Sequence, residues 1–263
     1  ITGLLDVSGT EITLGSGTFN AGTTTFNSAG SVTISEDSSL DLVGVNTAGS
    51  ADLDSTAAVS DAGATSVDIT GLLDVSGTEI TLGSGTFNAG SLTFNSVGSV
   101  NIVEDSAMLV SGPSSAGSGL DLVAADDVTL DSTVTVVGDV SIIAGTTTGG
   151  IDVNAKLNGS GAILLDAADE ITIDAAIDPT TVTLTADDDI TVNAAVVATD
   201  LITVSAGEDG SGGLTLTLSG SLTTTGAGSD VTVSTGSGSG DLSLAGTTTA
   251  LDQVLMTSSV GSI

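Results

Sequence analysis

The chain has 263 residues and carries one basic residue against 33 acidic ones, which gives a formal net charge of −32. Such a surface repels nucleic acids and anionic membranes, because proteins recognise both through Lys and Arg. The absence of Cys and His from the sequence excludes disulfides, thiolate sites and imidazole metal ligands. We therefore expect no nucleic-acid partner. We expect no membrane insertion either. A membrane-spanning helix needs about 20 apolar residues, and the longest apolar runs, such as 194–198, are much shorter.

The first predicted elements lie in a segment that occurs twice. Residues 1–22 read ITGLLDVSGTEITLGSGTFNAG, and residues 69–90 are identical. The similarity continues from 23–40 into 91–108 at the same offset of 68 residues. A fixed internal period indicates a repeat architecture. The four Phe residues lie in this region beside Asn, and we expect them to fill a core.

The second half of the chain carries a shorter unit. In TVTLTADDDITVNAAV (181–196), apolar residues alternate with Thr or Asn on either side of an acidic corner, which is the two-residue period of a strand. The leading apolar residues of successive units are Val140, Ile163, Val182, Ile202 and Val231. Their spacings are 23, 19, 20 and 29 residues, and the last contains a Gly/Ser-rich insertion around 208–213.

These spacings predict an all-β fold, a parallel β-helix or β-solenoid with about 20–23 residues per turn and corners of Gly, Asp, Asn and Ser. We interpret 1–263 as a single continuous solenoid, in which 1–68 and 69–119 are related units of about three turns and 120–263 are degenerate turns. About 12 turns stacked about 4.8 Å apart would form a rod on the order of 55–60 Å long. An antiparallel sandwich or Ig-like array is the alternative, but it usually shows a core Trp or Tyr and a period near about 100 residues.

Acidic residues gather at the predicted corners. Stacking would bring some of these carboxylates close together, and a hard cation such as Ca²⁺ would relieve their repulsion with oxygen ligands. The alternative interpretation is that they are solvated turn residues. The candidate Ca²⁺ ligands are Asp126, Asp127, Asp169, Glu170, Asp187, Asp188 and Asp189.

Catalysis is not expected from this sequence. Carboxylate pairs hydrolyse glycosidic bonds in some β-helical enzymes, so a carbohydrate-active enzyme is the third functional alternative. Such sites usually add a basic residue and an aromatic platform, whereas the only basic residue here is Lys156. A Ser-His-Asp triad cannot form without His.

The segments SGTFNAGTTTFNSAGSVTI, LDAADEITIDAAI and LTADDDITVNAAV resemble the filamentous-haemagglutinin-like and autotransporter-adhesin stalks of bacterial surface proteins. The resemblance covers the whole chain at the level of pattern, and it implies a right-handed coil. It also implies an extracellular, cell-surface location and a structural role as a fibre, stalk or surface-layer element. The expected partners are further copies or turns of the chain itself, or a cell-surface receptor or glycan. A Ca²⁺-binding adhesive module is the second functional alternative.

Overall fold

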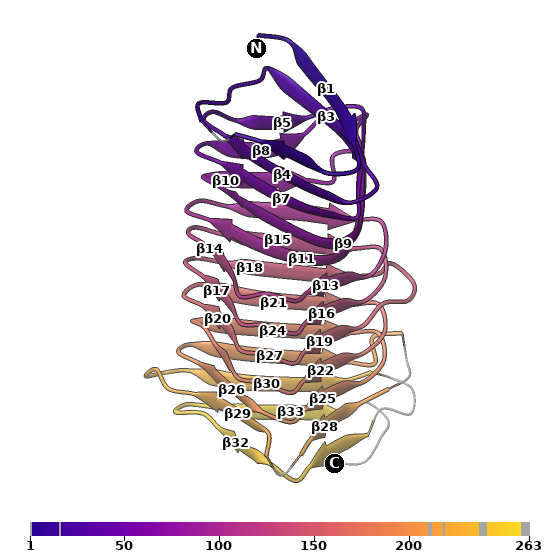
Figure 1. The fold of residues 1–263 in the computed structure, drawn as a ribbon. Coiled ribbons are helices and arrows are strands. Elements are labelled where there is room, and N and C mark those ends of the chain that lie inside the picture. Colours follow the sequence, from indigo (N-terminus) through magenta and orange to yellow (C-terminus); the bar gives the residue numbers. More distant parts are fainter. Residues whose placement is uncertain (1, 16, 210–211, 218, 237–240, 259–263) are drawn as a thin grey trace.

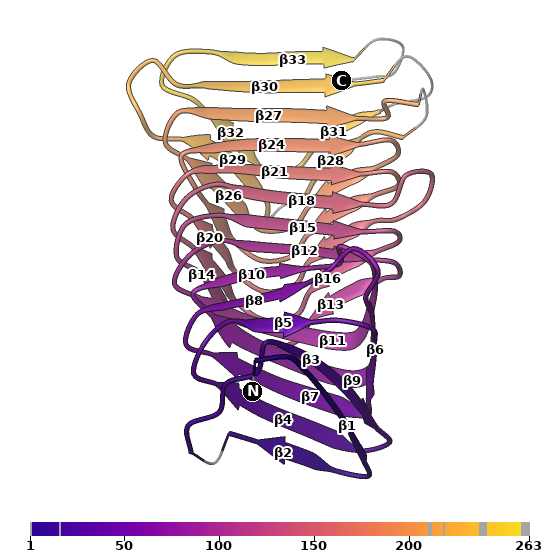
Figure 2. The ribbon, with the colours of Figure 1, turned by 90° about the horizontal axis from the view of Figure 1, so that it is seen from above.

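The computed structural model describes residues 2–15, 17–209, 212–217, 219–236 and 241–258. Over these residues every regular element is a β-strand, and parallel strands stack into a β-solenoid of about 12 turns. Figure 1 shows the turns piled along one axis, from the indigo N-terminal turns to the yellow C-terminal turns. Figure 2 shows the same stack from above, rotated by 90° about the horizontal axis of Figure 1.

From residue 100 onward each full turn contributes one strand to each of three faces. Face A consists of β12 (Val100–Glu104), β15 (Leu120–Ala124), β18 (Val140–Ala144), β21 (Ala162–Ala167), β24 (Thr181–Ala186), β27 (Leu201–Ala206), β30 (Asp230–Thr235) and β33 (Val254–Ser258). Face B consists of β13 (Met108–Val110), β16 (Val128–Leu130), β19 (Ile151–Val153), β22 (Ile171–Ile173), β25 (Ile190–Val192), β28 (Leu214–Leu216) and β31 (Leu242–Leu244). Face C consists of β14 (Ser114–Ala116), β17 (Val134–Val136), β20 (Leu157–Gly159), β23 (Ile177–Asp178), β26 (Ala195–Ala198), β29 (Ser221–Thr224) and β32 (Thr247–Thr249).

The N-terminal turns contain short strands together with strands of up to 12 residues. They are β1 (Leu4–Gly9), β2 (Ile12–Leu14), β3 (Thr23–Ser28), β4 (Ser31–Glu36), β5 (Leu40–Leu42), β6 (Val45–Ala48), β7 (Ser50–Ser55), β8 (Ala58–Asp61), β9 (Ser66–Gly77), β10 (Glu79–Leu82) and β11 (Thr86–Ser96). Two short strands, β5 and β6, both pair with β3, and 68 residues later β13 and β14 both pair with β11. The sequence repeat is therefore also a repeat of strand pairing.

The core is a column of inward-facing apolar side chains. In β24, Val182, Leu184 and Ala186 are buried, while the Thr residues between them are only partly buried. Each rung lies on the equivalent rung of the next turn, and apolar burial contributes about 25 cal/mol per Å². Because one turn cannot bury its own apolar face, stability depends on neighbouring turns.

The solenoid prediction is confirmed in its register. The predicted leading residues pair along face A as Val140 with Ile163, Ile163 with Val182, Val182 with Ile202, and Ile202 with Val231. Residues 210–211 of the predicted insertion lie outside the described residues. No helix in the described ranges is long and apolar enough to cross a membrane.

Candidate functional site: an acidic corner

The corner between faces A and B carries a ladder of acidic residues and glycines. Its rungs, each directly preceding a face B strand, are Asp127, Gly150, Glu170, Asp189, Gly213 and Asp241. Backbone hydrogen bonds connect every rung to the strand start of the preceding turn, from Val128 N–H to the Gly150 oxygen (2.9 Å) through to Leu214 N–H to the Asp241 oxygen (3.1 Å). We call this set the acidic ladder.

The two glycine rungs separate carboxylates and also bind them. Gly150 N–H donates to Asp127 Oδ1 at 2.9 Å, and Gly213 N–H donates to Asp189 Oδ1 at 2.7 Å. A side chain would not fit at the second glycine, because a Cβ there would collide with the backbone oxygen of Asp241. The glycines therefore dilute the negative charge and offer it hydrogen-bond donors.

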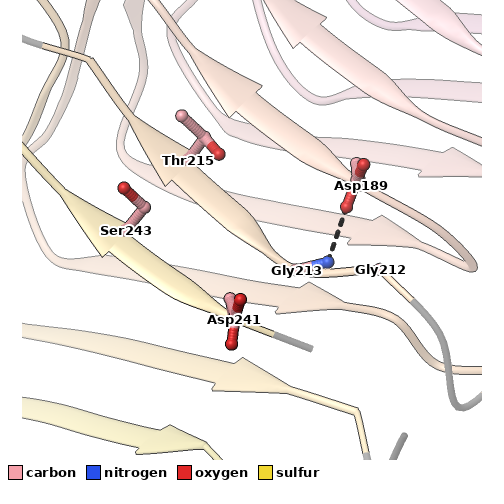
Figure 3. Close-up of a pocket in the computed structure, with 6 residues that line it drawn as sticks. All are labelled: Asp189, Gly212, Gly213, Thr215, Asp241 and Ser243. Carbon is pink, nitrogen blue, oxygen red and sulfur yellow. Dashed lines mark hydrogen bonds between the residues drawn. The ribbon is translucent and has the colours of Figure 1, made fainter. Parts of the chain in front are cut away.

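A shallow open pocket of about 310 Å³ lies at the C-terminal end of the acidic ladder. Figure 3 shows its lining, with Asp189 and Asp241 on either side of Gly213, and the hydroxyls of Thr215 and Ser243 on the adjoining strands. Thr215 and Ser243 are directly paired between β28 and β31. The lining thus offers carboxylate and hydroxyl oxygens, which suit a hard cation or water.

Carboxylates at this corner interact electrostatically. Burial raises the pKa of Glu170, and the neighbouring Asp169 and Asp152 carboxylates raise it further. The pKa of Asp169 is raised by burial and then by the charge of Asp188 on the next turn. These shifts follow first from burial and then from like charges on the same and adjacent turns.

Asp187, at the same corner, is also close to other carboxylates. Burial raises the pKa of Asp187, and the carboxylates of Asp209 and Glu208 on the following turn add to the shift. The pKa values of acidic residues are therefore raised at this corner on two successive turns.

The structure places all seven predicted ligands at this corner, between β15 and β16, β21 and β22, and β24 and β25. Only the last two groups occupy consecutive turns, where Asp188 N–H donates to the Asp169 backbone oxygen (3.0 Å). Asp126 and Asp127 are separated from them by the corner 145–150, which has no acid. Within the described part of the chain, no group of three or more acidic side chains is arranged to hold a metal ion, and Ca²⁺ binding stays a prediction.

Sequence reasoning missed Asp241 as a member of the acidic ladder. The Gly/Ser-rich stretch before it interrupts the period, so its place in the stack was hidden. A usable signal was present, because Asp127, Asp189 and Asp241 each precede an apolar–hydroxyl–apolar triplet.

Two acidic pairs in the N-terminal half form a different arrangement. Asp105 Oδ2 accepts a hydrogen bond from Phe87 N–H (2.9 Å), and Glu104 Oε1 accepts one from Ala89 N–H (2.8 Å). The equivalent pair, Glu36 and Asp37, binds the backbone of residues 19–21 in the same way. Unlike solvated corner acids, both glutamates are buried, and each has one oxygen, Oε2, without a hydrogen-bond partner.

No protein-family model matches the chain, and neither a curated protein nor a solved structure matches it. Function therefore has to be inferred from the fold and chemistry of the chain itself.

Proposed function

We propose that the chain is a non-catalytic structural segment of an extracellular fibre, stalk or surface layer, of the kind found in filamentous-haemagglutinin-like or autotransporter-adhesin surface proteins of prokaryotes. The observation that carries this proposal is the unbroken stacking of face A, in which each strand from β12 to β33 pairs with the next in parallel. Such a column gives length and stiffness along one axis. The excess of carboxylates keeps neighbouring rods soluble through charge repulsion.

The ends of the rod supply the means of self-association. At one end Val7 of β1 is only partly buried, although its counterpart Val75 inside the stack is fully buried, and at the other Val254 of β33 is 44 % exposed, although its partner Val231 is fully buried. An unpaired strand edge with apolar side chains is a template for a further strand. The partners that this function requires are further copies of the chain, which bind through these edges, or a cell-surface receptor or glycan bound along the rod.

Substituting Val254 tests self-association at the C-terminal edge. Val231 N–H donates to the Gln253 oxygen at 3.0 Å, so the backbone groups of the next residue, Val254, face away from β30. Val254→Pro removes the outward N–H without removing a hydrogen bond to β30. Val254→Ala is the control, because it shortens the side chain and keeps the N–H.

Sedimentation velocity over a concentration series, with negative-stain microscopy of the same samples, gives the readout. We expect the unmodified chain and Val254→Ala to form end-to-end assemblies as concentration rises, and Val254→Pro to remain shorter. A chain that stays a single short rod at every concentration would contradict self-association.

The raised pKa values at the acidic corner favour a second candidate function, binding of Ca²⁺ that stiffens the rod. Asp169 and Asp188 lie on consecutive turns, and the charge of Asp188 adds to the rise that burial causes in the pKa of Asp169. A divalent cation between two such carboxylates would relieve the repulsion, with backbone oxygens and water completing its coordination.

Calorimetric melting in CaCl₂, compared with NaCl of the same ionic strength, separates specific binding from general screening. Binding predicts a higher Tm in Ca²⁺, and Asp188→Asn should remove most of the difference. Asp178→Asn is the matched control, since Asp178 is an exposed acid on face C. Equal melting in the two salts would rule this candidate out.

A further inference from the structure

The repeated 22-residue segment offers a comparison within one molecule. Its first copy, 1–22, lies at the end of the stack, and its second copy, 69–90, lies inside it (Figure 1). Both copies pair with the following turn in the same register: Leu5 with Thr24 and Ile12 with Val32 in the first, Leu73 with Leu92 and Ile80 with Val100 in the second. The local sequence and the register of downstream pairing are thus the same in both copies.

The two copies differ on their other side. The second copy is covered by a preceding turn, in which β7 pairs with β9, β8 with β10, and the start of β9 with β11. The inward residues of that turn are Leu53, which pairs with Val75, Val59, which pairs with Ile80, and Val67, which pairs with Phe87. Among the described residues, β1 pairs only with β3, and β2 pairs only with β4.

Identical side chains are therefore buried to different extents. Val75 and Phe87 are fully buried, whereas their counterparts Val7 and Phe19 are only partly buried. The partly exposed Val7 and Phe19 are the counterparts of the side chains that Leu53 and Val67 cover in the second copy, whereas Ile12, the counterpart of Ile80, is buried without a preceding turn. The second copy thus shows which side chains fit this edge.

We propose that β1, β2 and Phe19 form a docking edge for one further solenoid turn. This turn would carry the inward side chains of residues 50–68, and it would lead directly into residue 1, as residue 68 leads into residue 69. The edge fits this pattern because its own sequence is identical to one that already accepts it. The inference rests on the proposed function, in that it assigns a partner to one end of the rod.

Fusion of a second copy of residues 49–68 directly ahead of Ile1 tests the proposal in the full chain. The junction then reproduces the natural sequence from 49 to 90. In the control fusion, the added equivalents of Leu53, Val59 and Val67 are replaced by Ser, which leaves the length and the acidic residues unchanged. Residue-resolved amide exchange by NMR is the readout, and identical sequence gives 1–22 and 69–90 nearly equal intrinsic exchange rates.

The pattern-matched fusion should slow exchange of the outward amides of β1 and β2 by about tenfold or more, toward the rates of their counterparts in 69–90. The Ser control should leave them as in the unmodified chain. Equal protection by both fusions, or by neither, would overturn the proposal. Exchange is measured at a concentration at which the unmodified chain is a single rod, so that end-to-end assembly does not protect the same amides.

The outcomes separate this inference from the proposed function. Docking of the fusion without concentration-dependent assembly would contradict self-association alone. Assembly without docking would contradict the proposed partner alone.

Discussion

At the scale of single residues, the buried carboxyl group of Glu104 sets the clearest pH response. Burial raises its pKa to about 7, against hydrogen bonds from Ala89 N–H and the Ser106 hydroxyl that lower it, and the Asp105 charge adds to the rise. Between the ordinary pKa of 4.5 and about 7, the folded chain holds a proton that the unfolded chain releases. The stabilisation is therefore complete below about pH 4.5 and is lost as pH rises through about 7.

We predict that Glu104→Gln flattens the decline in stability between pH 5 and pH 8. A neutral amide removes the cost of ionising a buried acid, which at about 1.4 kcal/mol per pKa unit is at most about 3 kcal/mol. Urea unfolding followed by circular dichroism across this pH range measures the difference. Asp126→Asn is the control because it removes one charge from an exposed corner. If both variants changed the pH profile equally, net charge rather than burial would be the cause.

Thr24 provides a second prediction at the residue scale. Its side chain is fully buried at the position that Leu92 occupies in the second repeat, and its hydroxyl has no hydrogen-bond partner. Thr24→Val should raise the free energy of unfolding by about 1 kcal/mol, because it removes an unpaired buried hydroxyl at nearly constant volume. Thr25→Val is the control, since the Thr25 hydroxyl donates to the Val43 oxygen at 2.6 Å. A gain from Thr25→Val equal to that from Thr24→Val would contradict this explanation.

At the scale of elements, glycines determine how closely a corner follows the turn beneath it. Gly117 and Gly119 lie in the corner between β14 and β15. A Cβ on Gly117 would collide with the Val97 backbone oxygen, whereas the nearest atom to a Cβ on Gly119 is the Asp139 oxygen at 3.7 Å. A side chain therefore has room at Gly119 but not at Gly117, although the two positions are only two residues apart.

We predict that Gly117→Ala destabilises the chain by about 2 kcal/mol and that Gly119→Ala is neutral or stabilising by up to about 1 kcal/mol. The first forces the backbone to move, and the second mainly reduces the entropy of the unfolded chain. Thermal unfolding of both variants provides the measurement. Equal destabilisation would mean that loss of backbone freedom, not the close approach, is the cause.

The same scale shows what sequence patterns can and cannot predict. Alternation within 181–196 and the spacing of leading residues predicted the turns correctly, because inward residues must be apolar on every turn. The merging of neighbouring strands into β9 and β11 was not predicted, since continuous pairing depends on the adjacent turns. The burial of Glu104 was missed for a similar reason, because its hydrogen-bond donor Ala89 lies 15 residues away.

At the scale of the whole molecule, the stacking of turns along one axis determines both stability and shape. Each turn is buried by its neighbours, so unfolding should begin at the open ends and proceed inward. The net charge of −32 opposes compaction over the entire surface. The length of the rod and the dependence of each turn on its neighbours are therefore linked properties.

Cryo-electron microscopy of the purified chain tests this account most directly. We predict elongated particles in which density repeats about every 4.8 Å along the long axis, one layer for each turn of parallel strands. Particles built from antiparallel hairpins packed into separate globular domains would contradict it.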